Sequence, residues 1–347
     1  MPAIDPVKAK VKTTYAHPAA FYGLCADPSG KRLYAGSEDY GIYLFDLEGA
    51  KKEPVAKWAK HDNYVSALVA VARAGKTLVV SGSYDRSLIW WDAAKGEVVR
   101  TVEAHAGWLR NLAALPDGNR LVSCGDDMLV KLWDTDSGKP IRTFQGHEMK
   151  TPQGHVTALY ALAVSPDGKH LASGDRHGTV IVWETDTGKA AQKFEVPTLY
   201  TYDPKQRKRS IGGIRSLAFS RDGTFLAAGG IGQVNNVDGL EGPAHVEVWE
   251  WRKPQVRFTA GAQGHKALIN DLLWHPDKTW LIGGGGGGDG GLVAFWKIDP
   301  MPDAPKKDAV VGQRVKVDGH VHRLVLGAAG MELYAAGHRR LDVWSLA

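Results

Sequence analysis

The chain has 347 residues, 44% of them hydrophobic, and carries a formal net charge of +5. This length allows a sizeable core, and the mild positive charge permits an acidic partner without requiring nucleic acid. Its two cysteines, Cys25 and Cys124, are too few for a disulfide framework or a zinc site. The first residues lack the apolar core of a signal peptide, and no apolar run reaches the roughly 20 residues of a membrane span. We therefore expect a cytoplasmic protein.

Seven similar units follow a short N-terminal segment, residues 8–16. Each unit begins with an apolar run such as FYGLCA or VSALVAV, turns at a Pro- or Gly-containing triplet such as PDG, and continues into a second run such as KTLVVSG. These runs predict short strands joined by tight turns. A third predicted strand ends in each unit at an aromatic residue, in order Phe45, Trp91, Trp133, Trp183, Trp249, Trp296 and Trp344.

Successive aromatic residues of this series lie 42 to 66 positions apart, and a period in the forties is typical of a four-stranded propeller blade. The seventh unit ends after its third strand, so we expect residues 8–16 to supply the fourth strand and close the ring. The predicted fold is an all-β, seven-bladed β-propeller of four-stranded antiparallel blades, in a single domain. The expected blades cover approximately residues 17–60, 61–104, 105–146, 155–195, 210–260, 265–318 and 320–347 with 8–16.

The repeated units resemble the WD-repeat family, and the resemblance covers nearly the whole chain. In that family an Asp, a His, a Ser and a Trp form a buried hydrogen-bonded chain in each blade, here called a tetrad. For the second and third units the resemblance implies tetrads of His61, Ser81, Asp85, Trp91, His105, Ser123, Asp127 and Trp133. In the fourth unit the alignment gives His155, Ser173 and Trp183, with His177 in the place of the Asp. Because the set recurs from blade to blade, it indicates a structural role rather than the single Ser-His-Asp site of a hydrolase.

Four segments are longer than the repeat requires: residues 145–155, 195–213, 229–245 and 282–292. They fall between blades or between the second and third strands of a blade, and these connections emerge on the same face of an up-and-down blade. We therefore expect all four on one face, where loops on a rigid scaffold often hold binding residues.

Two of these segments invite a chemical interpretation. The 195–213 segment combines Tyr200 and Tyr202 with the basic run 205–209, which suits phosphate groups, a nucleic-acid strand or an acidic peptide but also a solvated loop. The glycine-rich run 283–291 lacks the GK[ST] ending and the following helix of a phosphate loop, so we interpret it as a flexible loop.

Two places in the sequence raise the question of a metal site. The segment QVNNVDG and the pair His320 and His322 contain metal-ligating residue types. Neither offers a third ligand at a compelling spacing, and we predict no metal and no cofactor.

In the WD-repeat family, partner peptides commonly bind over the entrance of the central channel, on the face that carries the inserted connections. The resemblance places this rim just after the repeat His and just before the blade Asp of each unit. Tyr, Trp and Arg, which are enriched in binding hot spots, occur there, although Tyr22 and Tyr160 on this rim suit packing between blades equally well. The candidate partner-binding residues are Glu38, Tyr64, Tyr84, Trp108, Arg110, Asp126, Arg176, Tyr200, Tyr202, Lys205, Arg207, Lys208 and Arg215.

Three functions remain open from the sequence. The first is a non-catalytic scaffold that binds a peptide or partner protein on the face with the insertions. An alternative is a binder of nucleic acid or of a phosphorylated ligand through residues 200–209. A second alternative is a propeller enzyme with its site at the channel mouth, although no paired carboxylates or nucleophile motif stand out from the repeat.

Overall fold

The computed structural model describes residues 3–205, 209–234, 237, 242–299, 301 and 311–347. Within these residues, seven four-stranded antiparallel sheets and one two-stranded hairpin contain all the named strands. The predicted all-β class with seven four-stranded blades is therefore confirmed. The described helical turns are short, at η1 (Pro6–Lys8) and η2 (Pro197–Leu199), and no helix in the described part of the chain is long and apolar enough to cross a membrane.

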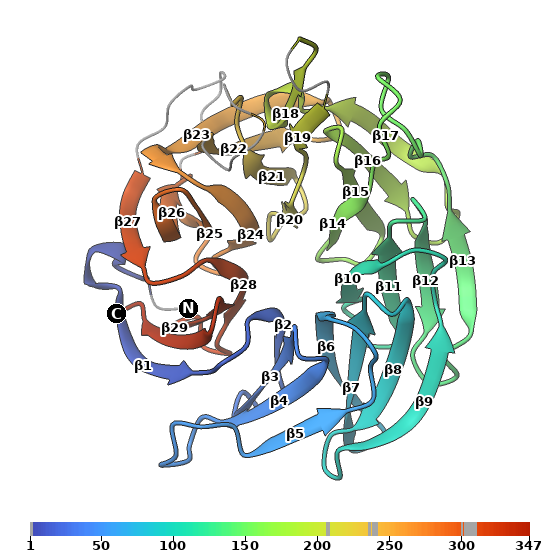
Figure 1. Cartoon of the computed structure of the whole chain (residues 1–347), viewed down its shortest axis with the longest axis vertical. Coiled ribbons are helices and arrows are strands. Elements are labelled where there is room, and N and C mark those ends of the chain that lie inside the picture. Colours follow the sequence, from blue (N-terminus) through green and yellow to red (C-terminus); the bar gives the residue numbers. More distant parts are fainter. Residues whose placement is uncertain (1–2, 206–208, 235–236, 238–241, 300, 302–310) are drawn as a thin grey trace. The chain divides into compact units, whose positions relative to one another are not determined.

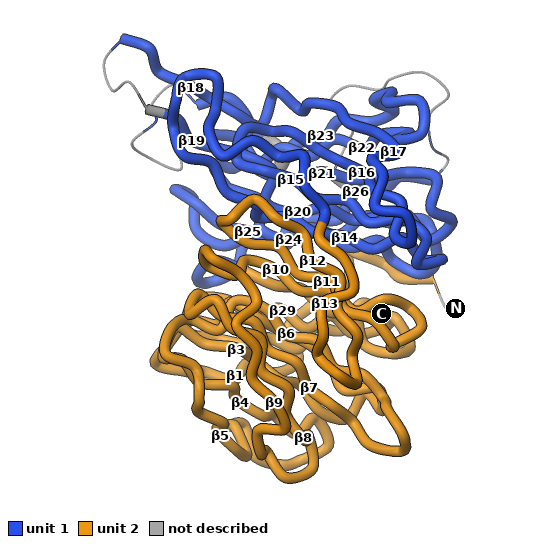
Figure 2. Tube along the Cα trace, turned by 90° about the vertical axis from the view of Figure 1, so that its right-hand side faces the viewer, with its two compact units in different colours: residues 1, 144–321 blue, residues 2–143, 322–347 orange. Residues whose placement is uncertain are grey.

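The chain divides into two units, coloured separately in Figure 2. One unit contains residues 2–143 and 322–347, and holds four blades. The strands of its first three blades, in pairing order, are β2 (Phe21–Ala26), β3 (Arg32–Ser37), β4 (Gly41–Asp46) and β5 (Ala56–Ala59); β6 (Val65–Arg73), β7 (Lys76–Ser83), β8 (Ser87–Asp92) and β9 (Glu97–Glu103); and β10 (Leu109–Ala114), β11 (Arg120–Gly125), β12 (Val130–Asp134) and β13 (Pro140–Phe144). The fourth blade of this unit, last in the sequence, consists of β28 (Val321–Leu326), β29 (Glu332–Gly337), β30 (Arg340–Ser345) and β1 (Lys10–Ala16).

The N-terminal strand completes the C-terminal blade, as the sequence predicts. β1 runs antiparallel to β30, from Lys10 opposite Ser345 to Ala16 opposite Arg340, and Figure 1 shows the blue N-terminal strand beside the red C-terminal ones. The Tyr15 ring is buried, with its centroid 5.0 Å from that of Phe45 in the first blade. The two ends of the chain are thus joined by a β-ladder and by core packing.

The other unit contains residues 144–321 and holds three blades and the hairpin. Its strands, in pairing order, are β14 (Leu159–Val164), β15 (His170–Asp175), β16 (Thr179–Glu184) and β17 (Ala190–Glu195); β18 (Tyr200–Asp203) and β19 (Arg209–Gly212), which form the hairpin; β20 (Ser216–Phe219), β21 (Phe225–Ile231), β22 (Pro243–Glu250) and β23 (Gln255–Lys266); and β24 (Leu268–Trp274), β25 (Trp280–Gly287), β26 (Gly290–Lys297) and β27 (Val311–Val317).

The position of a strand within its blade explains its composition. In the second blade, the central strands β7 and β8 are largely buried and rich in Val, Leu, Ile and Trp. The outermost strand β9 is mostly exposed and carries Glu97, Arg100 and Glu103. Charged side chains on an outer strand oppose pairing with another chain, so the sequence protects the open edge of the blade.

Among the described strand pairings, the first strands of five blades begin with a β-bulge that the repeat pattern does not reveal. In β2, Phe21 pairs with Ser37 and Gly23 pairs with Gly36, which leaves Tyr22 as the extra residue. The corresponding extra residues in the other four blades are Ser66, Arg110, Tyr160 and Asn270. A bulge changes the direction of the side chain it carries, so these side chains do not follow the alternation between the two faces of the sheet.

The tetrad hydrogen bonds are present in the second and third blades. In the second, the two ring nitrogens of His61 lie 2.7 Å from Asp85 Oδ2 and 2.7 Å from Ser81 Oγ. Trp91 Nε1 donates to the same Ser81 oxygen at 2.8 Å. Burial tends to raise the pKa of Asp85, but its hydrogen bonds with His61 and Ser87 outweigh burial and hold that pKa well below its ordinary value. The third blade repeats these contacts with His105, Asp127, Ser123 and Trp133.

The fourth blade also contains a complete tetrad, but not with the residues that the sequence predicts. His147 lies 2.8 Å from Asp175 and 2.8 Å from Ser173 Oγ, to which Trp183 Nε1 donates at 2.9 Å. The assignment of His155 and His177 was therefore wrong. The inserted loop follows the tetrad histidine instead of preceding it, and the carboxylate comes from two residues after the serine instead of four.

The glycine-rich run belongs mainly to a strand, so the prediction of a flexible loop was wrong for residues 283–287. A Cβ on Gly285 would lie 2.0 Å from the carbonyl oxygen of Leu268, and one on Gly291 would lie 1.8 Å from that of Gly319. These glycines are needed because neighbouring backbone approaches the β25–β26 pair too closely for any side chain.

Candidate functional site

Four aromatic side chains from three consecutive blades stack on one another in the unit of residues 2–143 and 322–347. The ring centroids of Tyr22 and Tyr64 lie 5.6 Å apart with an interplanar angle of 7°, and those of Tyr64 and Tyr84 lie 5.7 Å apart. Tyr84 and Trp108 are nearly parallel, at 4.8 Å and 4°. Stacked rings at these separations attract one another, so Tyr22, Tyr64, Tyr84 and Trp108 form one continuous surface, here called the aromatic ladder.

Irregular backbone at the strand ends positions the aromatic ladder. Tyr22 is the bulge residue of β2, and Tyr64 and Trp108 lie one residue before β6 and β10. Tyr84 directly follows β7, and its backbone N–H donates to the carbonyl of Tyr64 at 3.0 Å. All four side chains therefore start from backbone that is fixed by the blades rather than from long loops.

Arg110 fixes the Trp108 end of the ladder. Its guanidinium donates to both carboxylate oxygens of Asp126 at 2.7 Å, and Nη1 donates to the Tyr84 hydroxyl at 2.9 Å. The same group lies 4.7 Å from the ring centroid of Tyr84 and 5.0 Å from that of Trp108. A bidentate ion pair combined with cation–π contacts holds these rings in one arrangement.

The ladder is partly open to solvent. The side chain of Trp108 is 47% exposed although it is large and apolar, and with Tyr84 and Asp126 it lines a shallow hollow. At the other end, burial, the nearby Glu38 and the other tyrosines raise the pKa of Tyr22 to about 12. The Tyr22 hydroxyl therefore stays protonated and uncharged at neutral pH.

Two ladder neighbours were missed by the sequence analysis. The His322 ring lies 4.6 Å from that of Tyr22 at a tilt of 33°, and Tyr40 lies 6.2 Å from Tyr64 and is 44% exposed. The signal for His322 was its place as second residue of β28, equivalent to Tyr22 in β2. Glu38, which the sequence analysis also singled out, accepts a hydrogen bond from the backbone N–H of Ala20 at 2.8 Å, which joins the segment after β3 to the one before β2.

The other predicted residues that the structure describes belong to the unit of residues 144–321, which contains the β18–β19 hairpin. The side-chain amide of Gln233 donates to the carbonyls of Pro197 and Tyr200, at 3.0 and 2.7 Å. The Thr198 hydroxyl donates to the buried carboxylate of Glu247. These contacts anchor the base of the insertion on the fifth blade, so the described part of the segment is not a free solvated loop.

The described hairpin residues that the sequence analysis singled out are Tyr200, Tyr202 and Lys205. The Tyr200 hydroxyl donates to Gln153 at 3.1 Å, which brings the first and second insertions together. The Tyr202 ring lies 5.6 Å from that of His155, and Lys205 is exposed. Arg207 and Lys208 lie outside the described residues.

The two remaining predicted arginines are held by contacts within this unit. Arg176 Nη2 donates to the carbonyl of Ser210 at 2.9 Å. The guanidinium of Arg215 lies 3.9 Å from the ring centroid of Tyr160. Arg176 thus contacts the hairpin, whereas Arg215 packs on an aromatic ring.

The residues considered for metal binding do not assemble into a site in the described part of the chain, where no group of three or more His, Cys, Asp and Glu side chains has suitable geometry. His320 lies beside Gly286. The two asparagines of QVNNVDG and the two acidic residues near them, within 235–241, lie outside the described residues. Both cysteines are buried, and burial raises the pKa of both thiols, so neither is a reactive thiolate.

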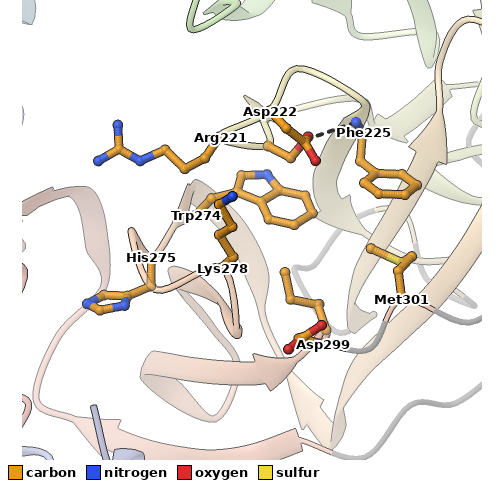
Figure 3. Close-up of a pocket in the computed structure, with 10 residues that line it drawn as sticks. Arg221, Asp222, Phe225, Trp274, His275, Lys278, Asp299 and Met301 are labelled. Atoms are coloured by element: carbon orange, nitrogen blue, oxygen red, sulfur yellow. Dashed lines mark hydrogen bonds between the residues drawn. The ribbon is translucent and has the colours of Figure 1, made fainter. Parts of the chain in front are cut away.

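A cavity that the sequence analysis did not indicate lies at the turns following β20 and β24. Figure 3 shows that Phe225, Trp274 and Met301 contribute its apolar lining, with charged residues around them. Trp274 Nε1 already donates to the carbonyl of Ala218 at 2.9 Å. The charges at the rim are mixed: Arg221, Lys278, Asp222 and Asp299. Such a rim selects neither an anionic nor a cationic ligand.

Comparison with known proteins gives one family. A family model described as "WD domain, G-beta repeat" matches residues 8–46, 52–92, 96–134, 138–184, 206–233 and 255–297. The chain is 36% identical to "Nuclear distribution protein PAC1" of Arthroderma otae over 130 residues, which make up 35% of this chain and 28% of that protein. It is 28% identical to "Nuclear distribution protein nudF" of Emericella nidulans over 140 residues, 34% of this chain and 31% of that protein. It is 29% identical to "Denticleless protein homolog" of Danio rerio over 115 residues, 33% of this chain and 18% of that protein. The chain thus covers less than a third of the length of each of these relatives.

Proposed function

Because this chain belongs to the WD-repeat family, we propose that it is a non-catalytic, cytoplasmic scaffold that binds a peptide or partner protein on the aromatic ladder. The observation that carries this proposal is the continuous stack from Tyr22 to the exposed ring of Trp108. Protein-binding hot spots are enriched in Trp, Tyr and Arg, and the ladder presents all three in contact with one another.

The rigidity of the ladder favours binding. Ordering a mobile side chain at an interface costs about 0.5–1.5 kcal/mol. Here the bidentate Arg110–Asp126 pair and the stacked rings hold the side chains before any partner arrives. An apolar or aromatic side chain of a partner that covers Trp108 therefore gains hydrophobic burial at little cost in entropy.

The buried tetrads do not supply an enzymatic alternative. The His61 side chain is fully buried, and its ring nitrogens contact Asp85 and Ser81, while Ser81 accepts from Trp91. A substrate has no access to a nucleophile in this position. Their contacts bind the strands of a blade to one another, which supports the scaffold proposal.

A pull-down with a matched pair of variants tests the proposal. Trp108→Ala removes the exposed end of the ladder, whereas Ile141→Ala removes an apolar side chain of similar exposure, 48% against 47%, from the outer strand β13. Loss of a hot-spot Trp costs about 2 kcal/mol or more, which is roughly a 30-fold loss of affinity. We expect partners captured by the unmodified protein from the source cell's lysate, quantified by mass spectrometry, to be lost from Trp108→Ala and retained by Ile141→Ala. Full retention by Trp108→Ala, or equal loss from both variants, would contradict the proposal.

A further inference from the structure

Two histidines in the fourth blade occupy the tetrad positions of the sequence repeat without belonging to the tetrad. His147 and Asp175 make the tetrad contacts instead. His155 and His177 contact the β18–β19 hairpin, at ring distances of 5.6 Å from Tyr202 and 4.8 Å from Tyr200. The departure from the repeat therefore places polar side chains beneath an insertion, where the blade itself does not require them.

A chain of contacts links four residues at this place, and a fifth, Thr157, adjoins the end of that chain in the sequence. The ring of His155 faces that of Tyr202, and Tyr202 pairs with Ser210 across the hairpin. Arg176 Nη2 donates to the Ser210 carbonyl at 2.9 Å. The backbone N–H of Arg176 donates to Ala158 at 2.9 Å, next in the chain to Thr157. His155, Thr157, Arg176, Tyr202 and Ser210 are called the hairpin cluster below.

Three polar atoms of the hairpin cluster are buried without a hydrogen-bond partner among the described residues. They are Nε2 of His155, Oγ1 of Thr157 and Oγ of Ser210. The side chains of Thr157 and Ser210 belong to residues that are only 3% and 6% exposed. A buried polar group without a partner destabilises a protein, because it loses its hydrogen bonds to water and gains none in return. Three of them in this one cluster of residues indicate a place that is built to bind something polar.

The chemistry of these groups favours an anion. Two hydroxyls and an imidazole nitrogen are able to donate, and Arg176 adds a positive charge with only one of its nitrogens engaged by the described residues. The neighbouring carboxylates Asp175 and Glu247 are already paired, with His147 and His245. Exposed Lys205 adds positive charge in the same segment.

We propose that the hairpin cluster binds a phosphate group. Arg176 supplies the charge, and Ser210, Thr157 and His155 donate hydrogen bonds to its oxygens. A phosphate offers more acceptor oxygens than a carboxylate, and it matches a set of several separate donors. This site goes beyond the proposed function, because peptide binding on the aromatic ladder requires no anion and uses different residues.

Calorimetric titration of the full chain in phosphate- and sulfate-free buffer tests the site. The probes are inorganic phosphate, N-acetyl-O-phosphoserine amide, and N-acetylserine amide as the uncharged control. We expect both phosphate compounds to bind at millimolar concentration, more weakly as salt is added, and the uncharged compound not to bind. Tighter binding of the phosphoserine compound would identify a phosphorylated side chain as the source of the group, and tighter binding of inorganic phosphate would identify a free anion; both results support the site.

Variants separate this site from general charge attraction. Ser210→Ala and Thr157→Val remove donors while preserving size and charge, and each should weaken binding at least fivefold. Arg176→Ala should weaken it further, whereas Lys193→Ala, the same charge change at an exposed position of β17, should not. The site is overturned if the unmodified protein binds neither phosphate compound, if Ser210→Ala and Thr157→Val bind as tightly as the unmodified protein, or if Lys193→Ala loses as much as Arg176→Ala. Trp108→Ala should leave phosphate binding unchanged, so failure of the ladder proposal and failure of this one are distinguishable.

Discussion

At the scale of single residues, the tetrads show that the structural role of a residue depends on where its side chain lies in the fold rather than on its spacing in the sequence. Asp175 accepts from the backbone N–H groups of His177 and Thr179 at 2.9 and 3.0 Å with one oxygen, and its other oxygen contacts His147. One carboxylate thus closes the turn between β15 and β16 and orients the histidine. The residue at the usual position, His177, is left to contact the hairpin.

Two residues of the fourth blade should respond differently to mutation: Asp175, which belongs to the tetrad, and His177, which the repeat places at the tetrad Asp position. Asp175→Asn weakens the charged hydrogen bond to His147, so the free energy of unfolding should fall by about 1.5–3 kcal/mol. His177→Asn should change it by less than about 0.5 kcal/mol, because His177 takes no part in the tetrad. Urea denaturation of both variants checks this pair. A larger loss of stability for His177→Asn than for Asp175→Asn would instead support the position of His177 in the tetrad that the repeat alone suggests.

At the scale of elements, the blades differ in how their strands are tied together. In the second, third and fourth blades, the serine on the second strand accepts from the tryptophan on the third and contacts the histidine that precedes the first. In the C-terminal blade, Trp344 pairs with Leu333, which puts Ala335 where the other blades have the serine. Trp344 Nε1 has no hydrogen-bond partner among the described residues.

Amide hydrogen exchange should follow this difference between blades. Opening a blade with a tetrad breaks buried side-chain hydrogen bonds in addition to the ladder, so its amides should exchange more slowly. We expect peptides covering β7, β11 and β15 to exchange more slowly than a peptide covering β29, when followed by mass spectrometry at neutral pH. Equal rates, or slower exchange in β29, would show that the tetrads do not govern local opening.

The elements also show which parts of the structure a single sequence reveals. Seven units with one closing aromatic each predict the blades, because every blade repeats the same apolar strands and turns. The bulge at Tyr22 or Arg110 is invisible, because it depends on the register between paired strands. The sequence singled out Tyr64, Tyr84 and Trp108 one by one, but their stacking requires contacts between blades.

Insertions and glycines misled the sequence analysis for a related reason. His147 was missed because the loop that follows it shifts the repeat spacing, and an alignment by spacing selects His155 instead. The glycine run suggests mobility in a sequence, whereas in the structure Gly285 is needed because the backbone of Leu268 lies against it. The first error comes from the position of an insertion and the second from a tertiary contact, and no local pattern contains either.

At the scale of the whole molecule, the pairing of β1 with β30 joins segments from opposite ends of the sequence. Thr14 Oγ1 donates to Asp342 at 2.6 Å, across 328 residues of chain. Tyr15 on the same strand is 4% exposed and packs in a core cluster with Phe45 and Tyr334. The N-terminal strand is therefore part of the core rather than an appendage.

Two substitutions on β1 should separate core packing from simple strand contact. Tyr15→Ala removes a buried ring and should lower the free energy of unfolding by about 3–5 kcal/mol. Val11→Ala, at a side chain that is 37% exposed, should cost less than about 1 kcal/mol. Chemical denaturation of the full chain measures both. A small effect of Tyr15→Ala would mean that the molecule is stable without this closure.

The same pairing has a consequence for how the protein is made. A ribosome adds about 5–20 residues per second, so roughly 15 to 65 s pass between the emergence of Thr14 and that of its partner Asp342. During that interval β1 has no strand to pair with. Its segment carries Lys8, Lys10 and Lys12 at alternate positions, and charge along an unpaired strand opposes association with other nascent chains. We therefore expect these lysines to keep β1 available until β30 has been made.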